Sequence, residues 1–266
     1  MFGYIYAQTT AELDVQLCEW IEHCWSEGDS KSLAEDSISA AQWGLQQKKV
    51  FCASWRLIGV WNKLELPCRA PAMPPEVLLG LAGYFVSIGR PDVTALLLIG
   101  FHCMLRMMEM LNIACNHLTM SNNLQGTILL PSTKMSKRRG GVETVYIEDP
   151  LTGVWAAWAK SKTPPFGSLL NGTVADFRRL FVQGLQYFGL TQLGFRLYSI
   201  RRGGASLDYR LHQSVSRTLF RGRWSDSQVA RIYVTEGAQL FNLLQVSEAS
   251  RKSLAGYAAR LARTPT

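Results

Sequence analysis

LPCRAPAMPP, residues 66–75, places four prolines between Pro67 and Pro75. Proline fixes φ and lacks a backbone N–H, so a segment this dense in proline does not lie inside a helix. A chain of 266 residues is long enough for two domains of ordinary size. We therefore expect a domain boundary here, between a small domain over residues 1–70 and a larger one over residues 71–266.

Helical patterns fill the segment before these prolines. TTAE, residues 9–12, is a capping-box pattern, and apolar residues then recur on one helical face until a glycine ends the run. Ser32 and Glu35 repeat the box before a second helix, and VFCASWRLIGVW, residues 50–61, predicts a third. The first domain is therefore expected to be a small helical domain.

Helical patterns also open the second domain and continue to about Ile113. The most apolar run, ALLLIGFHCML at residues 95–105, is too short to span a bilayer, which needs about 20 residues. It predicts a buried core helix instead, and we expect no membrane association.

The composition changes over residues 117–150. β-Branched and apolar runs alternate there with NNLQG, residues 122–126, and MSKRRGG, residues 135–141, which have turn and loop compositions. This pattern predicts a three-stranded antiparallel meander, after which helical patterns return. The expected fold class is mainly α with a small three-stranded antiparallel sheet.

The positive charge is unevenly distributed. Residues 1–70 contain 6 basic and 9 acidic residues, and residues 71–266 contain the other 22 basic and 11 acidic ones. Such an excess in a globular chain favours a polyanionic partner, above all nucleic acid. A solvated basic surface without a ligand remains the alternative.

The cysteines and histidines do not form a metal-site pattern. None of the six cysteines is in a C-x-x-C pair, and the chain has four histidines. The cysteines are therefore expected to be buried apolar residues in a reducing compartment. MFGYIYAQTT at the start lacks the basic and apolar regions of a secretory signal. We expect an intracellular protein without a metal or cofactor.

Two segments each place a basic residue at a specific point of an expected helix or strand. MLRMMEML, residues 104–111, places Arg106 and Glu109 one helical turn apart, so that they can meet on one helix face. STKMSKRRGG, residues 132–141, places Lys134 at the end of a strand before a basic loop.

Two later segments contain further candidates. YSIRRGG, residues 198–204, places Arg201 in the first turn of a helix that Ser199 is expected to cap. RWSDSQVARIYV, residues 223–234, places Tyr233 nine residues after Trp224, about two turns into a helix that begins with a further capping-box pattern.

In this order, the four segments resemble the tyrosine recombinase and phage integrase family across about residues 95–240. The resemblance implies a two-domain DNA clamp, made of a helical core-binding domain and an integrase-like catalytic domain. The positions that match the family's catalytic set are Arg106, Lys134, Tyr198, Arg201, Trp224 and Tyr233. Glu109 matches the acidic residue that supports the first arginine.

Phosphodiester transesterification explains why these residue types belong together. Tyr233 would be the nucleophile, and nearby cations favour its phenolate form. Arg106 and Arg201 would bind the non-bridging oxygens and stabilise transition-state charge in place of a metal ion. Lys134 would protonate the leaving 5′ oxygen, and Trp224 would offer its indole N–H to the phosphate.

One position departs from the family. Its second motif is usually H-x-x-R, and here Tyr198 stands where the histidine is expected. Tyrosine keeps a hydrogen-bond donor but loses a group that titrates near neutrality. Activity survives other residues at this position in the family, so the departure leaves both an active and an inactive protein open.

The resemblance also implies partners. Double-stranded DNA would be contacted through its phosphates, which makes affinity steeply salt-dependent. The candidate contacts are Lys137, Arg138, Arg139, Arg217, Arg221 and Arg223. Family members act as dimers on each site and tetramers across two, exchanging a C-terminal segment. EASRKSLAGYAARLA, residues 248–262, predicts an amphipathic helix for that exchange or for packing on its own domain.

The sequence thus predicts a site-specific recombinase or integrase, encoded by a mobile element, that works through a 3′-phosphotyrosine intermediate. A type IB topoisomerase would use the same chemistry. The alternative from another class is a recombinase-derived DNA-binding protein with weak or no catalytic activity, and a basic helical scaffold is a further one.

Overall fold

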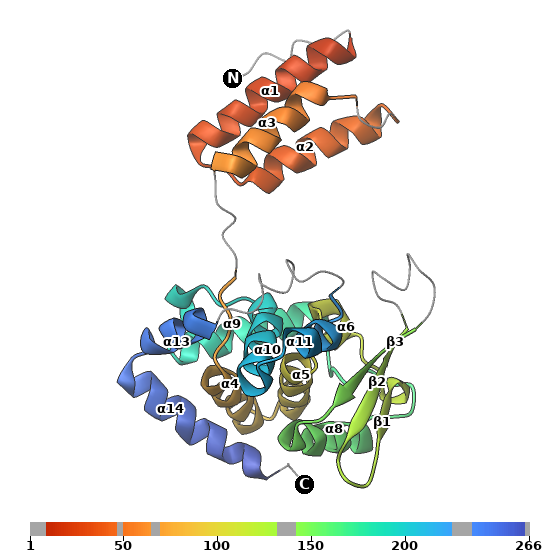
Figure 1. The fold of residues 1–266 in the computed structure, drawn as a ribbon, viewed down its shortest axis with the longest axis vertical. Coiled ribbons are helices and arrows are strands. Elements are labelled where there is room, and N and C mark those ends of the chain that lie inside the picture. Colours follow the sequence, from red (N-terminus) through yellow and green to blue (C-terminus); the bar gives the residue numbers. More distant parts are fainter. Residues whose placement is uncertain (1–8, 47–49, 65–69, 132–141, 225–235, 264–266) are drawn as a thin grey trace. The chain divides into compact units, whose positions relative to one another are not determined.

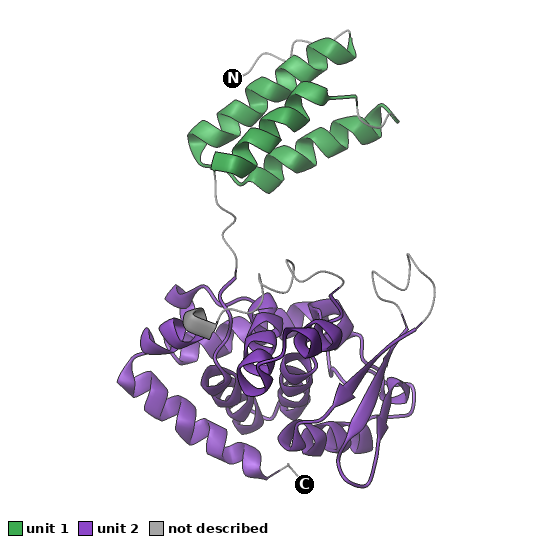
Figure 2. Ribbon diagram, viewed as in Figure 1, with its two compact units in different colours: residues 1–69 green, residues 70–266 purple. Residues whose placement is uncertain are grey.

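The chain forms two compact units, residues 1–69 and 70–266 (Figure 2). The computed structural model describes residues 9–46, 50–64, 70–131, 142–224 and 236–263 (Figure 1). The division between the units falls within the proline-rich stretch.

The first unit is a bundle of three helices: α1 Thr10–Glu27, α2 Lys31–Gly44 and α3 Cys52–Leu64. The capping box at the start of α1 is confirmed, since the Thr9 hydroxyl accepts a hydrogen bond from the Glu12 amide at 3.2 Å. The core consists of one apolar face from each helix with Phe51 beside them. Its buried residues are Leu17, Ile21, Cys24, Ala34, Ile38, Phe51, Ile58 and Trp61.

Two helix starts in this unit differ from the local pattern. α2 is capped by Ser30, whose hydroxyl accepts from the Leu33 amide, so the expected box from Ser32 was wrong. Ser30 has extended backbone, whereas Ser32 already lies in the helix. The start of α3 is capped from α1, because the Asp14 carboxylate accepts from the amides of Ala53 and Ser54 at 3.0 and 2.9 Å.

The second unit is built around α5, Pro91–His102, whose residues from Val93 to Phe101 are all buried. The expected core helix at residues 95–105 is confirmed, except that it ends at His102 and the chain turns at Met104, which has φ 48°. The other α-helices in the described residues are α4 Pro75–Ser87, α6 Met107–Leu111, α8 Pro150–Lys162, α9 Val174–Tyr187, α10 Leu197–His212, α11 Val215–Gly222, α13 Glu236–Leu244 and α14 Glu248–Ala258. Among the described residues, none of the helices is both long and apolar enough to cross a membrane.

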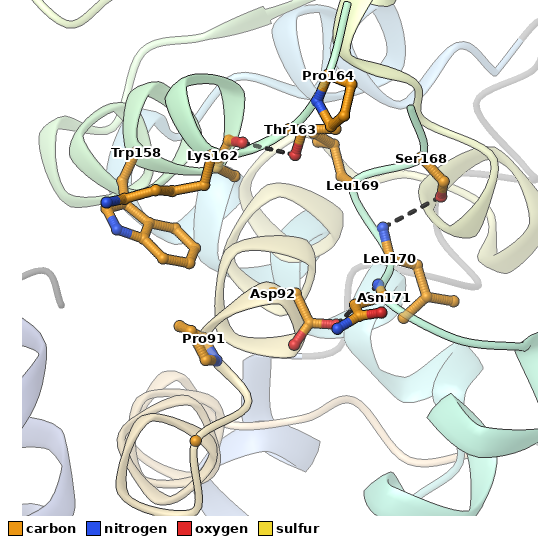
Figure 3. Close-up of a pocket in the computed structure, with 12 residues that line it drawn as sticks. Pro91, Asp92, Trp158, Lys162, Thr163, Pro164, Ser168, Leu169, Leu170 and Asn171 are labelled. Atoms are coloured by element: carbon orange, nitrogen blue, oxygen red, sulfur yellow. Dashed lines mark hydrogen bonds between the residues drawn. The ribbon is translucent and has the colours of Figure 1, made fainter. Parts of the chain in front are cut away.

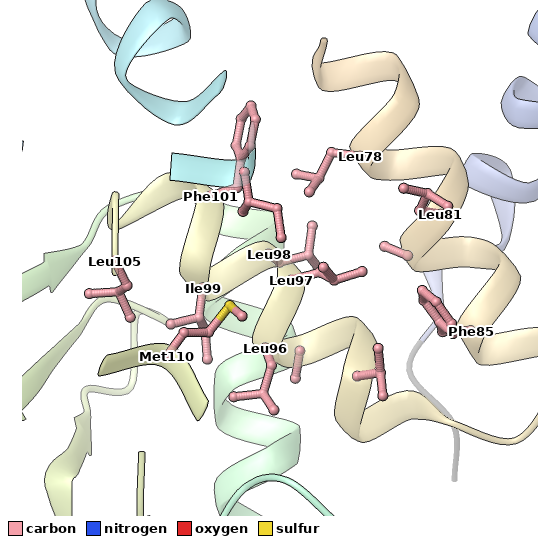
Figure 4. Packing of buried hydrophobic residues seen from close by; sticks show 14 of the residues in the cluster. Leu78, Leu81, Phe85, Leu96, Leu97, Leu98, Ile99, Phe101, Leu105 and Met110 are labelled. Carbon is pink, nitrogen blue, oxygen red and sulfur yellow. The ribbon is translucent and has the colours of Figure 1, made fainter. Parts of the chain in front are cut away.

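The packing of α4 against α5 forms the centre of this core. Leu78 and Leu81 of α4 lie across from Leu97 and Leu98 of α5, and the Phe101 ring lies toward α10, against Gly203 (Figure 4). All of these side chains are fully buried. This packing fixes the C-terminal end of α5. The residues that follow, Met104 and Arg106, contribute the first groups of the candidate site.

The sheet has strands β1 Leu118–Met120, β2 Gly126–Leu130 and β3 Glu143–Ile147, in the order β1-β2-β3. Both pairs are antiparallel, which confirms the expected meander. Leu130, at the end of β2, pairs with Glu143, at the start of β3. The connection between these two residues contains the basic loop, and its residues 132–141 lie outside the described part.

The last helix packs on its own domain, one of the two arrangements that the sequence left open. Leu254 of α14 lies against Gly80 of α4, and the Tyr257 carbonyl lies against Gly83. The hydroxyls of Tyr187 and Tyr257 are 2.6 Å apart, within a cluster of aromatic rings. α14 therefore completes the core of the second unit.

α10 lies unusually close to α5 and to the segment before α4, because one of its glycines faces each of them. A Cβ on Gly204 would stand 1.9 Å from the carbonyl oxygen of Phe101, and one on Gly203 would stand 2.3 Å from that of Met73. This close approach brings Arg201, one turn earlier on α10, to the end of α5.

Gly204→Ala is therefore expected to lower the free energy of unfolding by about 1–3 kcal/mol, because the added methyl forces α10 away from α5. Gly256→Ala is the matched control. Gly256 is also helical but has open space at its Cβ, so alanine there is expected to raise stability by about 0.5–1 kcal/mol. Urea unfolding of both variants checks this, and an unchanged midpoint for Gly204→Ala would contradict the close packing.

Candidate active site

The site is organised around the Glu109 carboxylate at the start of α6. One oxygen of Glu109 accepts from Arg106 Nη1 at 2.6 Å, and the other accepts from the Arg106 amide at 2.8 Å. The expected contact between these two residues is confirmed. The expectation that both lie on one face of the same helix was wrong. Arg106 is the N-cap of α6 with extended backbone, because α5 ends before it.

Arg201 comes to this carboxylate from α10. Its side chain is 2% exposed, and Nη1 lies 3.9 Å from a Glu109 oxygen. Nη1 donates to the Met104 carbonyl at 2.6 Å, and Nη2 donates to the Gly222 carbonyl at 2.7 Å. The two carbonyls, from the turn after α5 and the end of α11, fix the plane of the guanidinium.

The expected cap of α10 was wrong in its detail. The N-cap is Arg196, and Ser199 lies three residues into the helix, where its hydroxyl accepts from the Arg196 amide at 3.0 Å. Arg201 therefore lies in the second turn. This position lets its side chain reach back to the end of α5.

Trp224 follows α11 and covers Arg201. Its ring centroid lies 4.9 Å from the Arg201 guanidinium carbon, a cation–π contact. Its amide donates to the Leu219 carbonyl at 3.0 Å, and its ring packs on Gly222, where a Cβ would be 1.9 Å from the ring. The ring is thus held in place by the end of α11.

Arg223 completes a group that we call the arginine cluster, made of Arg106, Glu109, Arg201, Arg223 and Trp224. The Arg223 side chain is 9% exposed. Its Nη2 is 2.5 Å from a Glu109 oxygen, and its Nε is 3.3 Å from a carboxylate oxygen of Glu143, at the start of β3. Sequence reasoning placed Arg223 on the DNA backbone and did not identify Glu143. No local pattern joins Glu143 to this site, because the partner is far away in sequence.

The charges of the cluster stabilise one another. Burial raises the pKa of the Glu109 carboxyl, but the charge of Arg223 and the hydrogen bonds from Arg106 outweigh burial, so its pKa lies below the ordinary value. Burial also lowers the pKa of Arg223, against the pull of both carboxylates. The surrounding guanidinium groups therefore favour the anionic form of Glu109, which pairs with them.

Arg217 and Arg221 on α11 form a second group of ion pairs. Both reach one oxygen of Glu148, after β3, at 2.5 and 2.7 Å, and both approach Asp208 of α10 at 3.4 and 3.2 Å. Arg221 also donates to the His102 carbonyl. These arginines are thus paired with carboxylates at the junction of α10, α11 and the sheet.

The remaining expected site residues are Tyr198, which the structure describes, and five residues that lie outside the described part. Tyr198 lies one turn before Arg201 on α10, and its side chain is 43% exposed. The residues that lie outside the described part are Lys134, Lys137, Arg138, Arg139 and Tyr233.

A pocket of about 420 Å³ lies elsewhere in the second unit, between α5, α8 and the segment that follows α8 (Figure 3). Trp158 and Lys162 line one side, and Leu170 and Asn171 line another. It shares no residue with the arginine cluster. Within the described ranges, no three histidine, cysteine, aspartate or glutamate side chains form a group that could hold a metal ion.

No protein-family model matches the chain, and no curated protein matches its sequence. Its fold does match solved structures. The crystal structure of XerH site-specific recombinase bound to difH substrate, a pre-cleavage complex, aligns with a TM-score of 0.55 and 15% identity over 88% of this chain and 69% of that one. The post-cleavage complex of XerH with palindromic difH substrate aligns with a TM-score of 0.51 and 15% identity over 91% and 78%. The chain therefore has the tyrosine recombinase fold, with the mainly helical architecture and small antiparallel sheet expected from its sequence.

Proposed function

We propose that this chain is a site-specific DNA recombinase that cuts and rejoins DNA through a covalent 3′-phosphotyrosine at Tyr233, without a metal ion. The observation that carries the proposal is the convergence of Arg106 and Arg201 on Glu109, with the Trp224 ring over Arg201. Three segments far apart in the sequence supply them, within a fold shared with recombinases. Integration of a mobile element is the setting that we infer from the family resemblance.

The proposed step is an in-line displacement at phosphorus. The Tyr233 Oη–P bond forms as the bond from phosphorus to the 5′ oxygen breaks; the phenolic proton passes to solvent and Lys134 protonates the leaving oxygen. Arg106 and Arg201 stabilise charge on the non-bridging oxygens. Glu109 acts through these arginines, because it fixes Arg106 and balances Arg201.

DNA is the proposed partner, which agrees with the basic excess of residues 71–266. Lys137, Arg138 and Arg139 are proposed phosphate contacts on the loop after β2. Arg217 and Arg221 share Glu148, whose side chain is partly exposed, so phosphates would compete with that carboxylate for them. We further propose a dimer on each site and a tetramer across two, from the resemblance alone.

The test is a covalent adduct. Purified protein is incubated with EDTA and with nicked duplexes from the DNA that flanks its own gene, then denatured and resolved by gel electrophoresis. We expect a protein–DNA adduct that survives denaturation, with the nucleotide mapped by mass spectrometry to the peptide that contains Tyr233. An adduct on another residue, or one that requires a divalent cation, would contradict the proposed mechanism.

One observation favours the second candidate, a recombinase-derived DNA-binding protein. Tyr198 replaces the histidine of the H-x-x-R motif, and a tyrosine does not titrate near neutrality. This candidate predicts salt-dependent binding of the same duplexes with no adduct. In that case, the appearance of an adduct in Tyr198→His would assign the loss of activity to this one position.

A further inference from the structure

Arg223 joins two carboxylates that come from different parts of the second unit. Glu109 starts α6 and holds Arg106, and Glu143 starts β3. Both contacts use the same guanidinium: Nη2 donates to a Glu109 oxygen at 2.5 Å, and Nε lies 3.3 Å from Glu143 Oε2 in an ion pair without a hydrogen bond. A planar guanidinium can face two carboxylates with different edges in this way, whereas a lysine ammonium is a single point charge.

The backbone of Arg223 has a conformation that is unfavourable for a residue with a side chain. Its φ is 56°, in the left-handed region where glycine is favoured over residues with a Cβ. Both of its chain neighbours contact Arg201: the Gly222 carbonyl accepts from Arg201, and the Trp224 ring covers it. A shift of Arg223 would therefore also move the groups that orient Arg201.

Ion pairs connect α11 and the residue after it with the two ends of β3. A pocket of about 370 Å³ lies between them, lined by Cys103, Val145, Tyr146 and Phe220 together with the arginines and glutamates at its two ends. Phe220 is 78% exposed, so it does not fill this space. Val145 and Ile147 anchor the later part of β3 in the core. The Arg223–Glu143 pair connects the first residue of the strand, which β2 also pairs through Leu130, to the Glu109 site.

That first residue is the base of the β2–β3 connection. Glu143 pairs in register with Leu130, and Lys134 follows Leu130 by four residues along the chain. We propose that Arg223 is a positioning residue that holds the base of the β2–β3 hairpin against Glu109, and so sets the hairpin lysine relative to the two catalytic arginines. This inference rests on the proposed function, and it assigns Arg223 a role inside the site in place of a contact with the DNA backbone.

The experiment changes the leaving group, so that a misplaced Lys134 can be told apart from other causes of slow cleavage. Once wild-type protein has identified the scissile phosphate, that phosphate is synthesised with sulfur in place of the bridging 5′ oxygen. A thiol has a pKa of about 8.5, so the leaving thiolate needs no proton from Lys134. Single-turnover cleavage of the oxygen and sulfur duplexes is measured for Arg223→Lys and Glu143→Gln, together with DNA affinity and the unfolding midpoint.

We expect both variants to cleave the oxygen duplex about 10- to 100-fold more slowly, as for a misplaced catalytic group, and to cleave the sulfur duplex at close to the wild-type rate. Lys134→Ala should show the same pattern more strongly, and Arg106→Lys should lose both substrates. Arg223→Gly, which fits φ 56° without strain, repeats the test if the lysine variant does not fold.

Three outcomes would overturn the inference while leaving the proposed function intact. They are equal loss on both substrates, no loss on either, and a weaker DNA affinity with a shallower salt dependence, which would make Arg223 a phosphate contact. A Lys134→Ala variant that loses both substrates would remove the general acid on which the inference depends. If the wild-type protein forms no adduct with either duplex, the proposed function fails and the inference fails with it.

Discussion

Phenylalanine at position 233 is expected to abolish the covalent adduct and to leave DNA affinity unchanged. The substitution removes only the phenolic oxygen, and in the proposed mechanism that oxygen is the atom bonded to phosphorus. Loss of a nucleophile in other enzymes lowers the rate by a factor on the order of 10⁶, which is below detection in an adduct assay. Adduct yield and fluorescence anisotropy with the same duplex check the two parts of the prediction.

Tyr146→Phe is a suitable control for this experiment. Tyr146 is an exposed tyrosine on β3, and its hydroxyl has no role in the proposed site. The control variant is expected to form the adduct at the wild-type rate. If Tyr233→Phe still forms an adduct of unchanged size, Tyr233 is not the nucleophile.

Lysine at position 201 is expected to slow cleavage by about 10²–10³-fold, the effect of removing one donor that stabilises transition-state charge. Lysine keeps the positive charge but cannot donate to the Met104 and Gly222 carbonyls from one plane. Leaving one of these carbonyls unpaired is also expected to lower stability by about 1–3 kcal/mol. Single-turnover cleavage and thermal unfolding measure the two effects separately.

Arg202→Lys distinguishes the catalytic effect from the structural one. Arg202 is the next residue on α10, it is also buried, and its Nη1 donates to the Ala70 carbonyl. We expect Arg202→Lys to lower the unfolding temperature as Arg201→Lys does, and to retain cleavage. A comparable loss of cleavage in both variants would mean that Arg201 acts only through the packing of α10.

The ion pairs around the site have a consequence for the proposed binding of DNA. Arg217 and Arg221 share Glu148, and Arg223 is held between Glu109 and Glu143. Formal charge therefore overstates how many arginines are available to phosphates, because a paired guanidinium must leave its carboxylate first. The exposed side of Glu148 makes its arginines easier to release than Arg223, whose partners are more deeply buried.

Local patterns predicted most of the secondary structure. Proline density located the division of the chain, and apolar periodicity located the helices of both units. The turn compositions at residues 122–126 and 135–141, on either side of a β-branched and apolar run, located the meander. The misplaced caps at Ser32 and Ser199 have one cause: a serine near a helix start fits several cap positions, and the path of the incoming chain selects among them.

The order of the motif residues was also present in the sequence, and with it the prediction that Arg106, Glu109, Arg201 and Trp224 belong together. The structure brings these four together through the end of α5, α6, α10 and the end of α11. Tertiary structure alone decided how Arg201 is held, since its two carbonyl partners are ordinary backbone groups without a sequence pattern.

The sequence by itself therefore determined the helices and the sheet, because each depends on neighbours a few positions away, and the family resemblance supplied the candidate site residues. Only the tertiary structure decided the use of Asp14 as a cap for α3 and of Arg223 as a bridge between Glu109 and Glu143. Partners separated by 40 and 114 residues meet only after the helices have packed. Burial then decides whether an arginine faces solvent or a carboxylate, and burial is a property of the packed chain.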